Sequence, residues 1–276
     1  MEILLGGITS VLYGVADFLG GQGAKRAPAS SIVLWSGVVS FPLLAIAASV
    51  VGGDASLGDY LLGVVAGALG AVGLVMLFTG LGRGRAAVVA PIAAAVSALV
   101  PLAAGVLSGE RPSPLAWLGV VVGIPAIVLC ASVDDAGEDG RGGALLGTLA
   151  GIGFGGFAVV IHLTSDASSL LPLVSARGAA MITVLLIGLT GVWKLVGYRR
   201  IPIPIVVANG IFDATANVTL LLAIRAGSLA LAAVASSFYP AVTVLLSRIV
   251  NAESIRVRQV VGLGLTLVAL GLIAVG

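Results

Sequence analysis

The residues Asp-Asp-Ala-Gly-Glu-Asp-Gly-Arg-Gly-Gly, at positions 134–143, form the longest polar run in the sequence and lie almost at its midpoint. Five apolar segments of about 20 residues, the length of a membrane-spanning helix, precede this run and five follow it. Because five is an odd number of crossings, a second copy of the first half enters the membrane with the opposite orientation. The central run therefore predicts two inverted repeats, residues 1–132 and 143–276, joined by a polar linker at residues 133–142.

The overall composition excludes an ordinary soluble domain. Apolar residues make up 59% of the 276 residues and charged residues only 9%, whereas a soluble domain carries about 25% charged residues. The mean hydropathy is +1.20. Ten spans use nearly the whole length, so no room is left for a separate soluble domain. The sequence therefore predicts a multi-pass protein of the plasma or inner membrane.

Each apolar segment is long enough to cross a hydrocarbon core of about 30 Å as an α-helix. Helices are required because backbone polar groups in lipid must be satisfied within their own segment. The predicted fold class is an all-α membrane protein with ten transmembrane helices. The spans are Ile3–Gly21, Ile32–Val51, Tyr60–Gly80, Ala86–Leu107, Pro114–Ser132, Ala144–His162, Leu171–Val196, Ile203–Ile224, Ser228–Val250 and Val257–Val275.

A gapless comparison of the chain with itself gives an independent sign of duplication. At a constant offset of 143 residues, matching pairs fall at the same place relative to the span boundaries; they include Gly67 with Gly210, Gly84 with Gly227, and Glu110 with Glu253. Apolar matches carry little weight in so biased a composition, but the glycine and glutamate pairs do. The duplication is therefore expected to extend over most of both halves.

Several functional classes lack the residues that they need. The only cysteine, Cys130, and the only histidine, His162, lie in or at the end of apolar segments, so neither a metal cluster nor a catalytic Cys/His pair is expected. No block of lysine and arginine suggests nucleic acid. The sequence predicts no cofactor, no metal, no catalytic residue and no enzyme activity. His162 is interpreted as an interfacial residue.

Ionisable residues inside a span cost about 2.5 to 3.5 kcal/mol near the bilayer centre, so those that are retained usually face protein or water. Asp17 lies late in the first span, with Tyr13 one turn earlier on the same face. Two interpretations stay open for Asp17. It faces a cavity as a proton or cation site, or it is an interfacial carboxylate near the end of the span.

The eighth span carries a polar stripe at four-residue spacing, Asn209, Asp213 and Asn217. The residues that match them at offset 143 are all non-polar, so the stripe breaks the symmetry of the duplication. Cavity lining is one interpretation, and structural hydrogen bonds between helices are the other. Arg177, early in the seventh span, is a candidate electrostatic partner of the stripe or an arginine that extends to the interface.

Four aromatic residues within spans, Trp35, Phe154, Phe157 and Tyr239, are candidates to line the same cavity. Aromatic residues in spans more often pack between helices or form interface belts. From these aromatics, Trp35 and Tyr239 complete the predicted cavity site, together with Tyr13, Asp17, Arg177, Asn209, Asp213 and Asn217.

Four segments resemble the EamA branch of the drug/metabolite transporter superfamily: Gly84–Ala94, Ser108–Pro114, Ser237–Leu246 and Asn251–Glu253. The resemblance covers both halves and implies ten helices in two inverted repeats around a central cavity, with export or uptake of small metabolites. Its most specific element is the glutamate just after the fourth and ninth spans, Glu110 and Glu253. These glutamates, with Gly84 and Gly227, are interpreted as structural residues.

The first span differs from the commoner family pattern, which has Trp-Gly where this chain has Tyr13-Gly14. It also resembles the small multidrug-resistance relatives, in which a carboxylate of the first helix carries protons. Asp17 precedes Lys25 by a spacing similar to that of those proteins. A proton-carrying role of Asp17 is what this resemblance implies.

The orientation of the chain has two conflicting indications. Most lysines and arginines, from Lys25 and Arg26 to Arg256 and Arg258, fall in connections on the side opposite to the termini. The positive-inside rule then favours both termini outside. The family resemblance implies both termini in the cytoplasm.

These observations predict a secondary transporter that moves a small metabolite or drug-like solute by alternating access, with proton exchange at Asp17 or Asp213 as one option. The expected partners are a small-molecule substrate and the lipid bilayer, and both a monomer and a homodimer stay open. A channel or lipid scramblase is the alternative function, ahead of a membrane-embedded enzyme.

Overall fold

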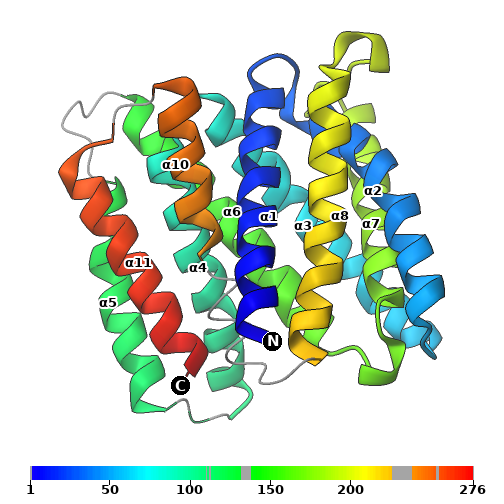
Figure 1. Ribbon diagram of the computed structural model, residues 1–276, viewed down its shortest axis with the longest axis horizontal. Coiled ribbons are helices and arrows are strands. Elements are labelled where there is room, and N and C mark those ends of the chain that lie inside the picture. The colour runs from blue at the N-terminus through cyan, green and yellow to red at the C-terminus, as the bar shows by residue number, and fades with distance from the viewer. Residues whose placement is uncertain are drawn as a thin grey trace.

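The computed structural model describes residues 2–109, 111, 113–131, 138–225, 238–252 and 255–275. Within these ranges the regular structure consists of α-helices and 3₁₀ turns, which short loops connect (Figure 1). The α-helices are α1 (Glu2–Ala24), α2 (Ala29–Val51), α3 (Leu57–Gly82), α4 (Ala86–Leu107), α5 (Pro114–Ala131), α6 (Glu138–His162), α7 (Leu171–Leu189), α8 (Ile203–Arg225), α10 (Tyr239–Asn251) and α11 (Val257–Val275). The 3₁₀ turns are η1 (Asp166–Ser168) and η2 (Tyr198–Arg200).

Most of the described helices have the length and composition of membrane spans. Seven of them, α1 to α4 and α6 to α8, are long and apolar enough to cross a bilayer, and the described apolar parts of α5 and α11 are somewhat shorter. Large aliphatic side chains such as Ile46, Val121 and Leu186 are exposed on the outside of the bundle. An outer surface of this kind suits lipid, because contiguous apolar patches are small on soluble proteins.

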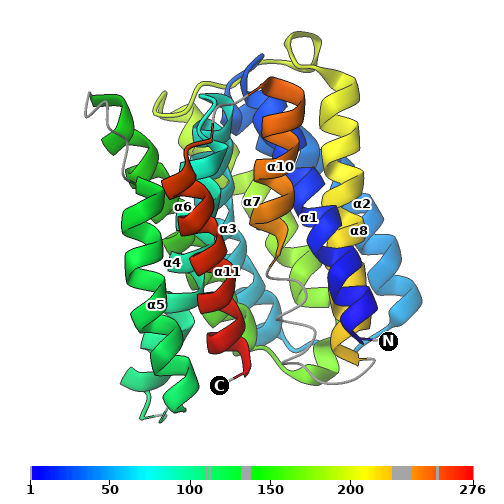
Figure 2. The ribbon, with the colours of Figure 1, turned by 60° about the vertical axis from the view of Figure 1, so that its left-hand side comes forward.

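The two halves run in opposite directions through the bundle. Both termini lie at the same end; α1 leads away from this end, and α6, the first helix of the second half, leads towards it (Figures 1 and 2). The last helices of the two halves, α5 and α11, pack side by side and are antiparallel. The predicted all-α fold with two inverted five-helix repeats is confirmed.

Helix packing follows the same twofold pattern. Helix α1 packs on α8 and α6 packs on α3, which are equivalent pairs when the halves are exchanged. Gly67 of α3 lies against the carbonyl oxygen of Ala176 in α7, and its repeat partner Gly210 of α8 lies against the carbonyl oxygen of Ser36 in α2. The glycines that match at offset 143 therefore serve equivalent backbone contacts, which close helix approach in lipid requires.

Gly67 leads to a stability prediction with a matched control. A Cβ atom at Gly67 would collide with the backbone of Ala176, whereas a Cβ atom at Gly271 of α11 would meet nothing within 4 Å. Because the obstacle is backbone, Gly67→Ala should lower the free energy of unfolding by about 2 kcal/mol or more. Gly271→Ala should leave it unchanged or raise it slightly, since alanine favours helices. Thermal unfolding of the two purified variants measures the difference, and equal midpoints would contradict this account of the α3–α7 contact.

The seventh helix is shorter than predicted. It ends at Leu189 instead of Val196, because Gly191 adopts a positive φ of 78° and turns the chain. The apolar residues that follow fold back onto the first turn of α2. There the backbone N–H of Val196 donates a hydrogen bond to Ser31 Oγ (2.9 Å), and Ser30 Oγ donates one to the carbonyl of Lys194 (2.6 Å). Apolarity alone did not distinguish this packed loop from a continued span.

Two further boundaries differ from the predicted ones by more than one helical turn. Helix α6 begins at Glu138, so part of the polar run that separates the halves is helical. Helix α10 begins at Tyr239 with Pro240 in its first turn. The first part of the predicted ninth span, residues 228–237, lies outside the described residues.

Basic residues gather at the end of the bundle opposite to the termini. Lys25 and Arg26 follow α1, Arg83 and Arg85 separate α3 from α4, and residues 194–200 contribute three more between α7 and α8. The positive-inside rule favours the cytoplasmic side for this end. The charge distribution therefore favours termini on the opposite side of the membrane.

We expect alkaline phosphatase fused after Gly276 to be active and a fluorescent protein fused there to stay dark. The reason is that the first reporter works only outside the cytoplasm and the second only inside it. The control is the same pair of reporters inserted after Gly197, in the basic connection, where the outcome should reverse. A fluorescent fusion at Gly276 would show that the basic end does not set the orientation.

Candidate functional site

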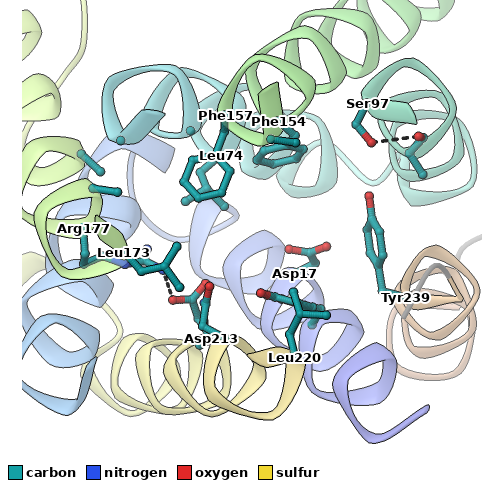
Figure 3. Close-up of a pocket in the computed structure, with 18 of the residues that line it drawn as sticks. Asp17, Leu74, Ser97, Phe154, Phe157, Leu173, Arg177, Asp213, Leu220 and Tyr239 are labelled. Carbon is teal, nitrogen blue, oxygen red and sulfur yellow. Dashed lines mark hydrogen bonds and ion pairs between the residues drawn. The ribbon is translucent and has the colours of Figure 1, made fainter. Parts of the chain in front are cut away.

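A cavity of about 570 Å³ lies in the interior of the bundle (Figure 3). Its volume is in the usual range for small-molecule sites, about 300–1,000 Å³. Residues of both repeats line it, from α1 to α4 and from α6, α7, α8, α10 and α11. They are Tyr13, Asp17, Leu44, Gly67, Gly70, Leu74, Ala94, Ser97, Ala98, Phe154, Phe157, Ala158, Leu173, Ala176, Arg177, Ala180, Asp213, Asn217, Leu220, Tyr239 and Leu270.

Helix α1 presents the first carboxylate to the cavity. Tyr13 and Asp17 are one turn apart on α1 and both line the cavity. Only 9% of Asp17 is exposed, and no side chain in the described part of the chain forms an ion pair with it. Beside it, Asn209 of α8 donates a hydrogen bond to the carbonyl oxygen of Ala16 (2.5 Å). Asn209 thus fixes α1 to α8 next to a carboxylate for which the described residues supply no counterion.

The second carboxylate is already paired. Arg177 of α7 donates a hydrogen bond to Asp213 of α8 and forms an ion pair with it, and the two side chains are 14% and 17% exposed (Figure 3). Asn217 lies one turn further along α8 and donates a hydrogen bond to the carbonyl oxygen of Asp213 (2.8 Å). With all three ionisable groups charged, Asp17 and Asp213 against Arg177 leave the cavity one negative charge in excess.

Aromatic side chains form another wall of the cavity. Phe154 and Phe157 of α6 pack over glycines of α3: a Cβ atom at Gly73 would lie 2.7 Å from the ring of Phe154, and one at Gly70 would lie 3.2 Å from the ring of Phe157. Figure 3 shows both rings in the same view as Asp17, with Tyr239 of α10 extending towards Ser97 of α4. The glycines thus make room for rings that face a mainly apolar space.

Close contacts join α1 to α3 and α10 before and after Asp17. Gly20 of α1 lies directly against the ring of Phe78 in α3. Thr243 Oγ1 of α10 donates a hydrogen bond to the carbonyl oxygen of Gly14 (3.2 Å), and Gln22 Nε2 donates one to Asn251 Oδ1 (2.6 Å). Gly20 and Gln22 follow Asp17 in α1, so their contacts lie on the basic side of Asp17, whereas the contact of Thr243 with Gly14 lies on the side of the termini.

The structure brings most of the predicted site residues together. Tyr13, Asp17, Arg177, Asp213, Asn217 and Tyr239 all line the cavity. Two others lie elsewhere: Asn209 is used between α8 and α1, and the indole N–H of Trp35 donates a hydrogen bond to the carbonyl oxygen of Val196 (3.1 Å). Trp35 also packs edge-on against Tyr198, with ring centroids 6.2 Å apart.

Ser97 is a polar lining residue that no sequence pattern indicated, and its hydroxyl donates a hydrogen bond to the carbonyl of Ala94 (2.9 Å). The aliphatic lining residues, such as Leu74 and Leu173, also have no distinguishing sequence pattern. An apolar side chain that lines a cavity has the same sequence signature as one that faces lipid, so no pattern distinguishes them.

A model of the EamA-like transporter family matches residues 1–132 and 141–275, which is nearly the whole chain in two units. The chain belongs to the EamA-like transporter family. This membership identifies a multi-pass membrane transporter of the drug/metabolite type. The family's repeat unit therefore corresponds to the two sets of helices that enclose the cavity.

A solved structure entitled "Crystal structure of protein" has the same fold, with a TM-score of 0.63 at 19% sequence identity over 99% of this chain and 96% of that chain. At this identity the likeness shows the fold alone. No curated protein matches the sequence significantly.

Of the four EamA-like motif residues, the structure describes one. Gly84 has a positive φ of 73° in the connection between α3 and α4, a conformation that favours glycine. Glu110, Gly227 and Glu253 lie outside the described residues, so their bracing role stays a prediction.

Proposed function

We propose that the protein is a secondary transporter that carries a small organic solute through the cavity by alternating access. The observation that carries this proposal is the central cavity, lined by residues of both inverted repeats and by the two carboxylates of Asp17 and Asp213 and the guanidinium of Arg177. Ionisable groups inside membrane-spanning segments are costly, and they commonly mark substrate or proton pathways. Inverted repeats with a midplane site are the architecture on which rocking between two states is built.

Proton exchange at Asp17 is the coupling step that the geometry supports. The charge of Asp213 is balanced by Arg177, whereas Asp17 has no cationic partner in the described part of the chain. An unpaired carboxylate in a cavity binds either a proton or a positively charged solute group, and the two exclude each other. The same carboxylate can therefore exchange a proton for solute as the cavity faces first one side and then the other.

Single-cysteine labelling tests alternating access without knowledge of the substrate. Because Cys130 is the only cysteine, Cys130→Ser gives a suitable background. We expect Asn217→Cys, on the cavity wall, to react with a charged, membrane-impermeant methanethiosulfonate added to either side of sealed vesicles. The control is Ile182→Cys, at a position 57% exposed on the outside of α7, which should react from neither side because lipid covers it. Reaction of Asn217→Cys from one side only, in all conditions, would contradict the proposal.

A channel or lipid scramblase is the second candidate. If the cavity were open to both sides of the membrane at once, Asn217→Cys would also react with reagent added to either side. The contacts of Gly20 with Phe78 and of Gln22 with Asn251 favour a carrier, since they bring α1 together with α3 and α10 between Asp17 and the basic end. We place this carrier in the plasma or inner membrane and assign it no enzyme activity.

A further inference from the structure

We propose that the cavity takes a monovalent organic cation with a small apolar body, in which the cationic group binds Asp17 and the body lies against Phe154 and Phe157. This inference rests on the proposed transport function and specifies the class of its substrate. It depends on three features of the described cavity: an unpaired carboxylate, an arginine that is already occupied, and an aromatic wall.

The charge balance of the cavity selects a cation. Asp17 is more than nine-tenths buried and lines the cavity without an ion-pair partner among the described residues. A buried carboxylate without a counterion is expensive, and a bound cation offsets that cost. A monovalent cation brings the formal charge of the three ionisable groups and the solute to zero, whereas an anion would make it more negative.

The Arg177–Asp213 ion pair favours binding of a cation over binding of a zwitterion. A zwitterion such as an amino acid would need a second partner for its carboxylate, and among the described residues of the cavity wall Arg177 is the cation. The guanidinium of Arg177 is engaged by Asp213, so a solute carboxylate would have to displace an existing partner. Removing one partner of a buried ion pair is strongly unfavourable, because it leaves the other charge buried and unpaired. A solute with an ammonium group alone avoids this cost.

The aromatic wall fits the apolar body of such a cation. Phe154 and Phe157 are seated on the glycines of α3, which fix where the rings lie. Ring faces attract cations within about 6 Å of the ring centre, and they also pack against apolar groups. The remaining lining is mainly aliphatic, with the hydroxyl groups of Tyr13, Ser97 and Tyr239 and the amide of Asn217 as polar exceptions. An arylalkyl amine matches both kinds of surface.

Isothermal titration calorimetry of the purified full-length protein in nanodiscs, with empty nanodiscs as blank, tests this class directly. Four probes share one phenyl-containing body and differ in charge: phenethylamine, phenylalanine, 3-phenylpropionate and 2-phenylethanol. We expect phenethylamine to bind, with dissociation constants at least tenfold higher for the other three. Asp17→Asn should raise the phenethylamine constant at least tenfold. Phe154→Ala should raise it about threefold or more.

The control variant is Asp54→Asn, the same chemical change in an exposed connection outside the cavity, which should bind phenethylamine as the wild type does. Equal or tighter binding of phenylalanine, phenylpropionate or the alcohol, or binding of none of the four, would overturn the proposed substrate class. These outcomes concern the wild-type protein and do not depend on the folding of a variant. They are also independent of the cysteine-labelling result, so failure of the substrate class can be told from failure of the transport function.

Discussion

Proteoliposomes that contain Asp17→Asn should accumulate no solute above the level of protein-free liposomes when a pH gradient is imposed. The wild-type protein should accumulate the same solute well above that level. The physical reason is that asparagine neither ionises nor takes up a proton, so the only unpaired carboxylate of the described cavity is lost. A charged partner contributes about 1.5–3 kcal/mol to an interaction, so solute affinity should also fall about 10- to 100-fold.

The matched control for this result is Asp54→Asn, which removes a carboxylate of an exposed connection and should leave accumulation unchanged. Uptake of a radiolabelled solute, with equal amounts of reconstituted protein, measures all three samples. Accumulation by Asp17→Asn that equals the wild type would exclude Asp17 as the coupling group. If Asp17→Asn and Asp213→Asn each accumulated solute to the wild-type level, proton exchange at either carboxylate would be excluded.

Separating Arg177 from Asp213 should destabilise the protein strongly. Asp213→Leu leaves a guanidinium without its partner between α7 and α8, at a position only 14% exposed. Breaking one side of a buried ion pair costs about 3–5 kcal/mol, and we expect a loss of about 3 kcal/mol here because the pair borders a cavity. Arg177→Met should cost a similar amount, since it leaves Asp213 unpaired.

The double variant Arg177→Met/Asp213→Leu should recover much of this loss, because it leaves neither charge unpaired. A double-mutant cycle on unfolding free energies measures the interaction. Additive losses in the double variant would show that the pair contributes nothing beyond its separate side chains. The control is a second cycle on two residues that do not touch, Gly271→Ala and Asp54→Asn. The change in unfolding free energy of that double variant should equal the sum of the changes in the two single variants.

Much of the fold could be predicted because a segment that spans lipid must be apolar, helical and long enough to cross the bilayer. Spans of sufficient length, an odd number of crossings in each half and the offset of 143 residues together indicated inverted repeats. The end of α7 could not be read in this way. The chain turns at Gly191 and continues with apolar residues that are held by Ser30 and Ser31 of α2. That contact depends on a helix far away in sequence, which local hydropathy does not reveal.

The ionisable part of the site was predictable because charged groups in a span need a reason to be there. Asp17, Arg177 and Asp213 are such groups, and all three line the cavity. The roles within the polar stripe on α8 could not be assigned in the same way, because Asn209 donates a hydrogen bond to a carbonyl of α1 whereas Asn217 faces the cavity. Both are asparagines at helical spacing, so only the position of α1 separates their roles.

Trp35 shows that an aromatic residue in a span indicates a cavity less reliably than an ionisable residue does. Its indole N–H serves the loop after α7, whereas Phe154 and Phe157 line the cavity because glycines of α3 leave room for their rings. The relevant signal was therefore on the facing helix, in the spacing of Gly70 and Gly73. These glycines indicate the positions of the two rings only when it is known that α3 packs against α6.

The central claim is that one cavity between the two repeats carries solute across the membrane in a saturable, alternating manner. Counterflow in proteoliposomes tests it most directly: vesicles are loaded with unlabelled phenyltrimethylammonium, phenylalanine or benzoate and diluted into the radiolabelled form of the same solute. The account predicts that at least one solute transiently accumulates above its equilibrium level, at a rate that saturates with concentration. Equilibration without such an overshoot, at a rate proportional to concentration, or no protein-dependent uptake of any of the three, would contradict it.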